Sequence, residues 1–190
     1  MKKILFALVC CLSANSFAQN LYVVDSVKSQ PLVYRNDSGG FKGCGIRTVF
    51  VTNVPKPSYV GDISVNVFKQ DSGKVVGLVK IIYSKIGNLN DPNSTTNIPL
   101  TKFMFANASG QAFRLGEIQP GEVPNSYLTQ SSPVDALQYL TDAIGGKATQ
   151  VGVTFKSDAS TMRIFSLKNT PLSPDEMAPL ATCMKQVSNQ

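Results

Sequence analysis

An alternating run of apolar and polar residues in the first half of the chain constrains the fold more than any other sequence feature. Within 62–69, Ile63, Val65 and Val67 alternate with Ser64, Asn66 and Phe68. Such alternation is typical of a strand with one buried face. The turn formers at 71–73 follow, and β-branched residues resume over 75–83. The pattern predicts an antiparallel hairpin.

The same criteria predict further strands. A single strand is expected over 44–54, and two more hairpins are expected, pairing 100–106 with 111–118 and 149–156 with 161–167. Asn, Asp, Ser, Thr and Pro dominate 87–99, which is expected to be the longest surface loop.

Two helices are expected in the second half of the chain. Ser132 and Pro133 have the form of a helix start, and apolar residues at helical spacing predict a helix over 133–144. Near the end, Ser173 and Glu176 have the form of a capping box. Pro179 would remove an internal helical hydrogen bond, so the sequence predicts a short turn over 174–177 and then a helix over 179–187.

These elements together predict an α+β fold that is mostly antiparallel β. The sheet is expected to form a sandwich or to curve, with two short helices, one of them at the C-terminus. No repeat and no change in composition divides the chain, which favours one domain.

The N-terminus has the pattern of a signal peptide. Two lysines precede an uncharged apolar run over 4–12, and Ser16 and Ala18 supply the small residues that precede a cleavage site. Cleavage is expected between Ala18 and Gln19, which leaves a single exported β-rich domain over 19–190. The apolar run is too short to span a bilayer, which needs about 20 residues. We therefore expect a periplasmic or secreted protein and not an integral membrane protein.

Cys10 and Cys11 raise the alternative of a lipoprotein. The residue before an acylated cysteine should be small, but Val9 precedes Cys10 and Cys10 precedes Cys11. Ordinary cleavage after Ala18 fits the pattern better, so lipidation is not expected.

Cleavage would leave Cys44 and Cys183 as the only cysteines. An even pair in an exported protein predicts a disulfide between them. The alternative is a reactive Cys44, but the chain has no histidine to activate it and no Cys-x-x-Cys motif.

The absence of histidine limits the chemistry that the chain can perform. It excludes Ser-His and Cys-His catalysis and every zinc site that uses histidine. The oxygen-bearing residues of the 87–99 loop lack the spacing of an EF-hand. The sequence therefore predicts no metal, no cofactor and no catalytic residue. The remaining enzymatic hypothesis is a carboxylate-dependent hydrolase that uses Glu117 and Glu122 as acid and base.

Charge suggests where a partner would bind. Loss of Lys2 and Lys3 with the signal leaves 16 basic and 12 acidic residues, a net charge of +4. Lysines recur along the first predicted hairpin, beside the polar 87–99 loop. A basic surface of this kind attracts anionic partners. The predicted interaction surface consists of Lys74, Lys80, Lys85, Asn88, Asn90 and Asn93.

The sequence therefore favours a non-catalytic binding protein of the bacterial cell envelope, such as an inhibitor, an immunity protein or an envelope interaction factor. The expected partner is another protein or an anionic envelope component, and not a nucleic acid. A structural subunit of a surface appendage or secretion apparatus is the first alternative, and the carboxylate-dependent hydrolase is the second.

Overall fold

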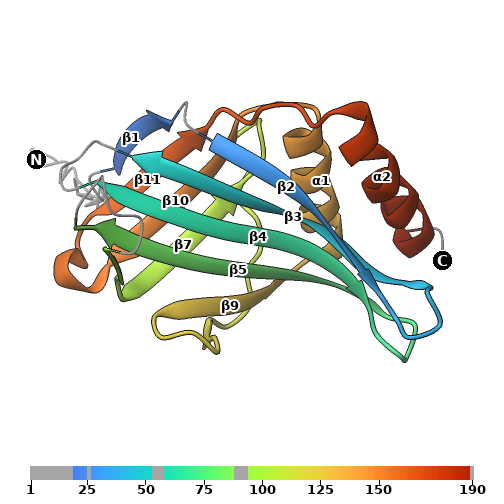
Figure 1. Cartoon of the computed structure of the whole chain (residues 1–190). Helices are drawn as coiled ribbons and strands as arrows, with labels where there is room; N and C mark the ends of the chain where they lie inside the picture. Colours follow the sequence, from blue (N-terminus) through green and yellow to red (C-terminus); the bar gives the residue numbers. More distant parts are fainter. Residues whose placement is uncertain (1–18, 25–26, 53–57, 88–93, 189–190) are drawn as a thin grey trace, which may run out of the picture.

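The computed structural model describes residues 19–24, 27–52, 58–87 and 94–188, which form two β-sheets and two α-helices (Figure 1). The predicted signal peptide at 1–18 lies outside the described residues. The strands are β1 (Gln19–Val24), β2 (Val27–Arg35), β3 (Phe41–Thr52), β4 (Tyr59–Lys69), β5 (Val75–Ile86), β6 (Thr95–Asn97), β7 (Leu100–Ala106), β8 (Gln119–Pro120), β9 (Ser126–Ser131), β10 (Thr149–Phe155) and β11 (Met162–Leu167). The helices are α1 (Pro133–Ile144) and α2 (Pro174–Ser188), and a 3-10 turn spans Lys156–Asp158.

The larger sheet has the strand order β2-β3-β4-β5-β9-β8, with β6 paired to the end of β5, and all its pairs are antiparallel. The smaller sheet has the order β1-β11-β10-β7, and only β1 runs parallel to its neighbour. The expected class of a mostly antiparallel β fold with two helices, one at the C-terminus, is confirmed.

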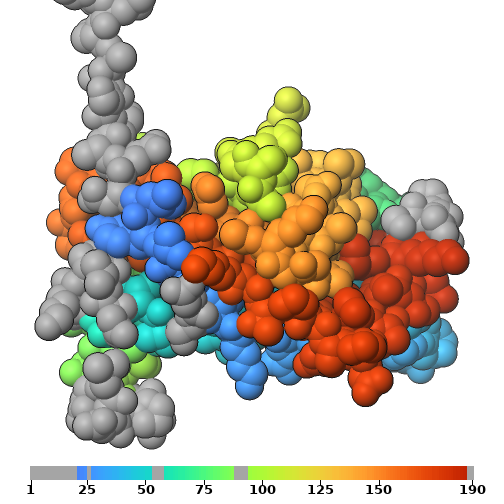
Figure 2. Space-filling view, turned by 90° about the horizontal axis from the view of Figure 1, so that it is seen from above, coloured from blue at the N-terminus to red at the C-terminus, as the bar shows by residue number. Residues whose placement is uncertain are grey.

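One face of the large sheet is covered by two different layers. At one end the small sheet packs on it, where Phe50 and Tyr83 contact Phe165 with ring centroids 5.8 and 5.7 Å apart. At the other end α1 and α2 cover the same face, and Figure 2 shows the two helices side by side. The core lies between these layers and the inward side chains of β3, β4 and β5. We call the opposite side the outward face of the large sheet.

The first predicted hairpin is confirmed and is longer than expected. β4 and β5 pair from Tyr59 with Lys85 to Lys69 with Val75. Gly73 in the turn has φ of +82°, a backbone angle that glycine adopts without strain. The expected pairing of 149–156 with 161–167 is also confirmed, as β10 and β11.

The second predicted hairpin is wrong in its second half. β7 forms over 100–106 as expected, but 111–118 makes only the isolated bridges Ala106–Ala112 and Leu115–Ser131. The partner of β7 is instead β10. Next to β5 lies β9, which the sequence analysis did not predict. The apolar residues of 111–118 still contribute to the core, because Phe113 is buried and packs against Tyr139.

Helix α1 has the predicted bounds, and local chemistry explains both its start and its buried face. The Ser132 Oγ accepts a hydrogen bond from the Val134 backbone N–H at 3.2 Å, and Pro133 occupies the first turn, where its missing N–H costs no helical bond. The fully buried residues Tyr139 and Leu140 fix the face of the helix that packs on the large sheet.

Helix α2 corrects the expectation of a break near Pro179, since one helix runs from Pro174 to Ser188. The predicted capping box is present: the Ser173 backbone N–H donates to the Glu176 carboxylate at 3.0 Å. Leu180, Cys183 and Val187 are all buried on one side of the helix. Their burial against the large sheet outweighs the single hydrogen bond that the proline removes.

Cys44 on β3 and Cys183 on α2 face each other, as the sequence predicts, and both are completely buried. The structure does not support the predicted disulfide between them. The Cys183 thiol donates its hydrogen to the Gly43 carbonyl at 3.2 Å. A buried pair of thiols therefore joins α2 to β3 through packing and a hydrogen bond.

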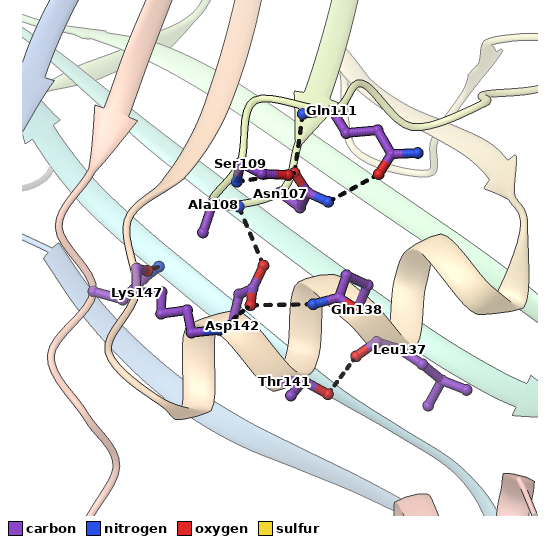
Figure 3. A network of polar contacts seen from close by, with 10 residues as sticks. Asn107, Ala108, Ser109, Gln111, Leu137, Gln138, Thr141, Asp142 and Lys147 are labelled. Carbon is purple, nitrogen blue, oxygen red and sulfur yellow. Dashed lines mark hydrogen bonds and ion pairs between the residues drawn. The ribbon is translucent and has the colours of Figure 1, made fainter.

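A buried carboxylate links α1 to the turn after β7 (Figure 3). The Asp142 side chain is nearly inaccessible to solvent and accepts from the Ala108 backbone N–H and from Gln138, each at 3.1 Å. Lys147 completes an ion pair with it at 3.3 Å. Asn107 organises the turn itself by accepting three hydrogen bonds from Ser109 and Gln111. The polar groups of this cluster form their hydrogen bonds and ion pair with one another. The cluster therefore stabilises the contact between α1 and the turn after β7.

Candidate functional site

The outward face of the large sheet is where the structure leaves a broad set of side chains accessible. The alternation of β3, β4 and β5 places alternate residues on this face, and most of them are partly or fully exposed. Asn66 is an exception: it lies on the outward face and is only 3% exposed. A buried amide on an otherwise accessible face indicates a locally organised site.

A hollow of about 320 Å³ opens on this face. Pockets for small molecules have volumes of about 300–1,000 Å³, so this one suits a small ligand or one group of a larger partner. Its lining comes from four neighbouring strands and combines charged, polar and apolar side chains. The lining residues are Leu32, Tyr34, Arg47, Asp62, Ser64, Lys80 and Ile82.

A chain of hydrogen bonds organises the polar part of the hollow. The Tyr34 hydroxyl donates to Asn66 Oδ1 at 3.2 Å, and Asn66 Nδ2 donates to Ser64 Oγ at 3.3 Å. Burial raises the pKa of Tyr34, which keeps its hydroxyl protonated as a donor. Gly45 makes the arrangement possible, because a Cβ there would overlap Asn66 Oδ1 and the Val65 carbonyl. The Phe68 ring packs on Tyr34 with 4.8 Å between centroids and holds that ring in place.

Two cations and one anion complete the lining. Arg47 donates from Nε and Nη2 to the two carboxylate oxygens of Asp62, at 2.9 and 2.7 Å. This bidentate pair raises the pKa of Arg47 and leaves its Nη1 hydrogens unused by Asp62. Among the described residues, Lys80 has neither an ion pair nor a side-chain hydrogen bond. The hollow therefore carries one more positive charge than negative charge.

A second hollow of about 280 Å³ lies beside the first, over β5 and β9. It is lined by Leu78 and Leu128 together with Glu117. Leu128 is the direct neighbour of Lys80 across the β5–β9 pair, so the two hollows adjoin along one row of the sheet.

The proposed acid–base pair is not gathered in either hollow. Glu117 lines the second hollow, whereas Glu122 is exposed and lines neither. A glycosidase needs its two carboxyl groups to converge on one bond. Neither hollow supplies such a pair from these residues, and the hydrolase hypothesis gains no support from this geometry.

The predicted interaction surface is distributed rather than compact. Lys74 lies in the turn before β5 and Lys85 near its end, about 35 Å apart along an extended strand. Lys80 faces outward into the hollow, while Lys85 has the opposite strand parity. Of the three lysines, Lys80 lines the first hollow, and neither Lys74 nor Lys85 lines either of the two hollows described. Asn88, Asn90 and Asn93 lie outside the described residues.

The described residues contain no group of three or more Cys, Asp or Glu side chains that could hold a metal ion. Within the same part of the chain, no helix is both long and apolar enough to cross a membrane. No protein-family model, curated protein or solved structure matches the chain. Function must therefore be inferred from the residues and their geometry.

No sequence motif marks Tyr34, Arg47, Ser64 or Asn66 as site residues. The alternation within 62–69 does place Ser64 and Asn66 on the outward side of one strand. Their grouping with Tyr34 and Arg47 depends on the registers of β2 with β3 and of β3 with β4. Register depends on the connecting turns and on packing against the core, so it has no signature within either strand alone.

Proposed function

We propose that this chain is an exported, non-catalytic binding protein of the bacterial cell envelope that holds an anionic partner on the outward face of its large sheet. The observation that carries the proposal is the 320 Å³ hollow, where Arg47 and Lys80 are opposed by the single carboxylate of Asp62. Excess positive charge in a concave site raises the local concentration of anionic ligands. The strand register beneath the hollow fixes the backbone positions from which these side chains extend.

Export rests on the N-terminal pattern, in which a basic start, an apolar run and small residues lead to Ala18. Expression of the full chain in a Gram-negative host tests this part. We expect the protein in the periplasmic fraction or medium, with an N-terminus at Gln19. A chain that stays in the cytoplasm with its first 18 residues attached would contradict export.

The binding face can be tested by site-specific photo-crosslinking in the envelope. Gln30 is exposed, faces outward and pairs directly with Arg47, so a photoreactive benzoylphenylalanine there would lie beside the hollow. Val134 is the matched control, because it is 72% exposed on α1, beyond the opposite side of the sheet. We expect adducts from the Gln30 position and not from Val134. Adducts from Val134 alone, or from neither position, would contradict the proposed face.

A structural subunit is a second candidate that one observation favours. β1 forms an edge of the small sheet, and its Leu21 and Val23 side chains are 62% and 59% exposed. An edge strand can pair with a strand from another chain. Sedimentation velocity across a wide concentration range distinguishes the candidates: a subunit would assemble, whereas a binding protein of the proposed type would keep one sedimentation coefficient. Leu21→Lys would abolish any assembly through this edge.

A further inference from the structure

The strand register aligns Arg47, Ser64 and Lys80 in a single row across the outward face. Arg47 on β3 pairs directly with Ser64 on β4, and Ser64 pairs directly with Lys80 on β5. Neighbouring strands are about 4.8 Å apart, so the two cationic residues start about 10 Å from each other with the serine midway. Both cations have long, flexible side chains, which can converge on one group above Ser64.

The Ser64 hydroxyl lines the hollow and has a hydrogen available to donate. Its oxygen already accepts from Asn66 Nδ2, and Asn66 Oδ1 is in turn held by the Tyr34 hydroxyl. A serine hydroxyl has one hydrogen to donate, and this chain of bonds does not use it. The row therefore presents, in order, a guanidinium, a hydroxyl donor and an ammonium.

These donors match an oxyanion, meaning a carboxylate or phosphate group. Oxyanions accept several hydrogen bonds at once, and bonds between charged partners are the strongest of their kind. Asp62 occupies one side of Arg47, so the bound group would be held by the remaining Arg47 hydrogens together with Ser64 and Lys80. A cationic ligand would meet the uncompensated charge of Lys80.

The rest of the lining is apolar and extends the site beyond the charged row. Leu32, Ile82 and the Tyr34 ring all line the same hollow. Each of these side chains is partly exposed, so contact with an apolar group would remove hydrocarbon surface from water. A ligand that satisfies both parts of the site carries an oxyanion next to an apolar segment.

We propose that the row Arg47–Ser64–Lys80 binds the oxyanion of an amphiphile, and that Leu32, Ile82 and Tyr34 hold the adjoining apolar segment. This inference rests on the proposed function and specifies the ligand class of the same face. The phosphate of a lipid and the carboxylate of a fatty acid share this chemistry.

Isothermal titration of the mature protein with short amphiphiles tests the inference, since eight-carbon chains allow titration below micelle formation. The probes are octyl phosphate, octanoate, octyltrimethylammonium and inorganic phosphate. We expect the two anionic amphiphiles to bind, inorganic phosphate to bind at least tenfold more weakly, and the cation not to bind. Stronger binding of octyl phosphate would assign the site to phosphate-bearing amphiphiles, and stronger binding of octanoate to fatty carboxylates. Equal binding of the cationic and anionic probes would overturn the proposal.

Variants locate the site. Arg47→Gln, Ser64→Ala and Lys80→Gln should each weaken binding of the preferred anion about tenfold or more, because each removes one charge-assisted hydrogen bond. Lys74→Gln is the matched control: it removes the same charge from an exposed turn outside the hollow and should leave affinity unchanged. Circular dichroism of each variant confirms folding. Equal losses from Lys74→Gln and Lys80→Gln would overturn the site and show nonspecific charge attraction.

The outcomes separate this inference from the proposed function. Crosslinking from Gln30 without binding of either anionic amphiphile would leave the binding face standing and refute the ligand class. If there were neither crosslinking from Gln30 nor binding of an anionic amphiphile, the binding face and the ligand class would both be refuted.

Discussion

Asn66 donates a hydrogen bond from Nδ2 to Ser64 Oγ across 3.3 Å, between two residues of the same strand that share the outward face of the large sheet. Gly45, the direct partner of Asn66 on β3, leaves the space that the amide occupies. The space left by Gly45 admits the Asn66 amide, and the amide bonds to the Ser64 hydroxyl. The hydroxyl hydrogen of Ser64 therefore remains available to a ligand on this face. The stability of this arrangement can be tested separately from any ligand.

Gly45→Ala should destabilise the protein by about 1–3 kcal/mol, because the new Cβ would overlap Asn66 Oδ1 and the Val65 carbonyl. Gly116→Ala is the control, since its Cβ would meet its nearest neighbour, the Gln130 carbonyl, at an ordinary 3.5 Å. Urea unfolding should show a lowered midpoint for the first variant and a change within about 0.5 kcal/mol for the second. Equal urea midpoints for Gly45→Ala and the parent would contradict this. They would show that Asn66 moves away from the new Cβ without loss of free energy of unfolding.

Asp142→Ala should cost about 2–4 kcal/mol, because it leaves the Ala108 N–H and the Gln138 amide without their acceptor in a nearly inaccessible place. Lys147→Ala removes only the exposed end of the network and should cost less than about 1 kcal/mol. Thermal unfolding of both variants measures the difference. A larger loss from Lys147→Ala would assign the stability of this cluster to the ion pair instead.

The protein should lose stability as the pH rises above 10, and Tyr83 should account for part of the loss. Burial raises the pKa of Tyr83 above its ordinary value of 10.0, so the unfolded chain releases this proton at a pH where the folded chain retains it. The unfolded state then binds fewer protons, and the free energy of unfolding falls by about 1.4 kcal/mol per pH unit for such a group. Below pH 10, Tyr83 is protonated in both the folded and the unfolded chain, so it causes no loss of stability there.

Tyr83→Phe isolates this effect, since it keeps the ring and removes the ionisable hydroxyl. Urea unfolding at several pH values between 8 and 11 should give a shallower decline above pH 10 for the variant than for the parent. Near neutral pH the variant should be at least as stable, because the hydroxyl has no hydrogen-bond partner among the described residues. Parallel declines for both proteins would show that Tyr83 does not stay protonated in the folded state.

In the reduced protein, the thiols of Cys44 and Cys183 should resist alkylation. Both side chains are fully buried, and burial raises the pKa of each thiol, which suppresses the reactive thiolate. Iodoacetamide should label neither cysteine of the native mature chain at pH 8 and both after unfolding in urea, as mass spectrometry can show. Rapid labelling of the native protein would mean that α2 separates from β3 far more often than its buried contacts imply.

Local chemistry accounts for the elements that the sequence predicted well. Helix α1 begins with Ser132 and Pro133, whose caps act over a few residues, and the β4–β5 hairpin follows from alternation around a short turn. The failures involve nonlocal choices. Segment 111–118 has the composition of a strand, but β10 pairs with β7 in its place. Helix α2 continues through Pro179, and three of its side chains are buried against the large sheet.

In the candidate site, too, local features could be predicted from the sequence and nonlocal ones could not. Lys80 was predicted as part of a surface because its charge is visible in the sequence. Its neighbours in the hollow, Arg47 and Tyr34, come from strands whose registers determine the row and its hydrogen bonds. Small shifts of register would move these side chains to the core, so the site depends on the packing of the whole sheet.

Titration of the ¹⁵N-labelled mature protein with octyl phosphate, followed by NMR, tests whether the outward face of the large sheet is the binding surface. Amide shift changes should centre on Arg47, Ser64 and Lys80, and helices α1 and α2 should be unaffected. Changes centred on the helices or on the small sheet, or no change at any residue, would contradict it.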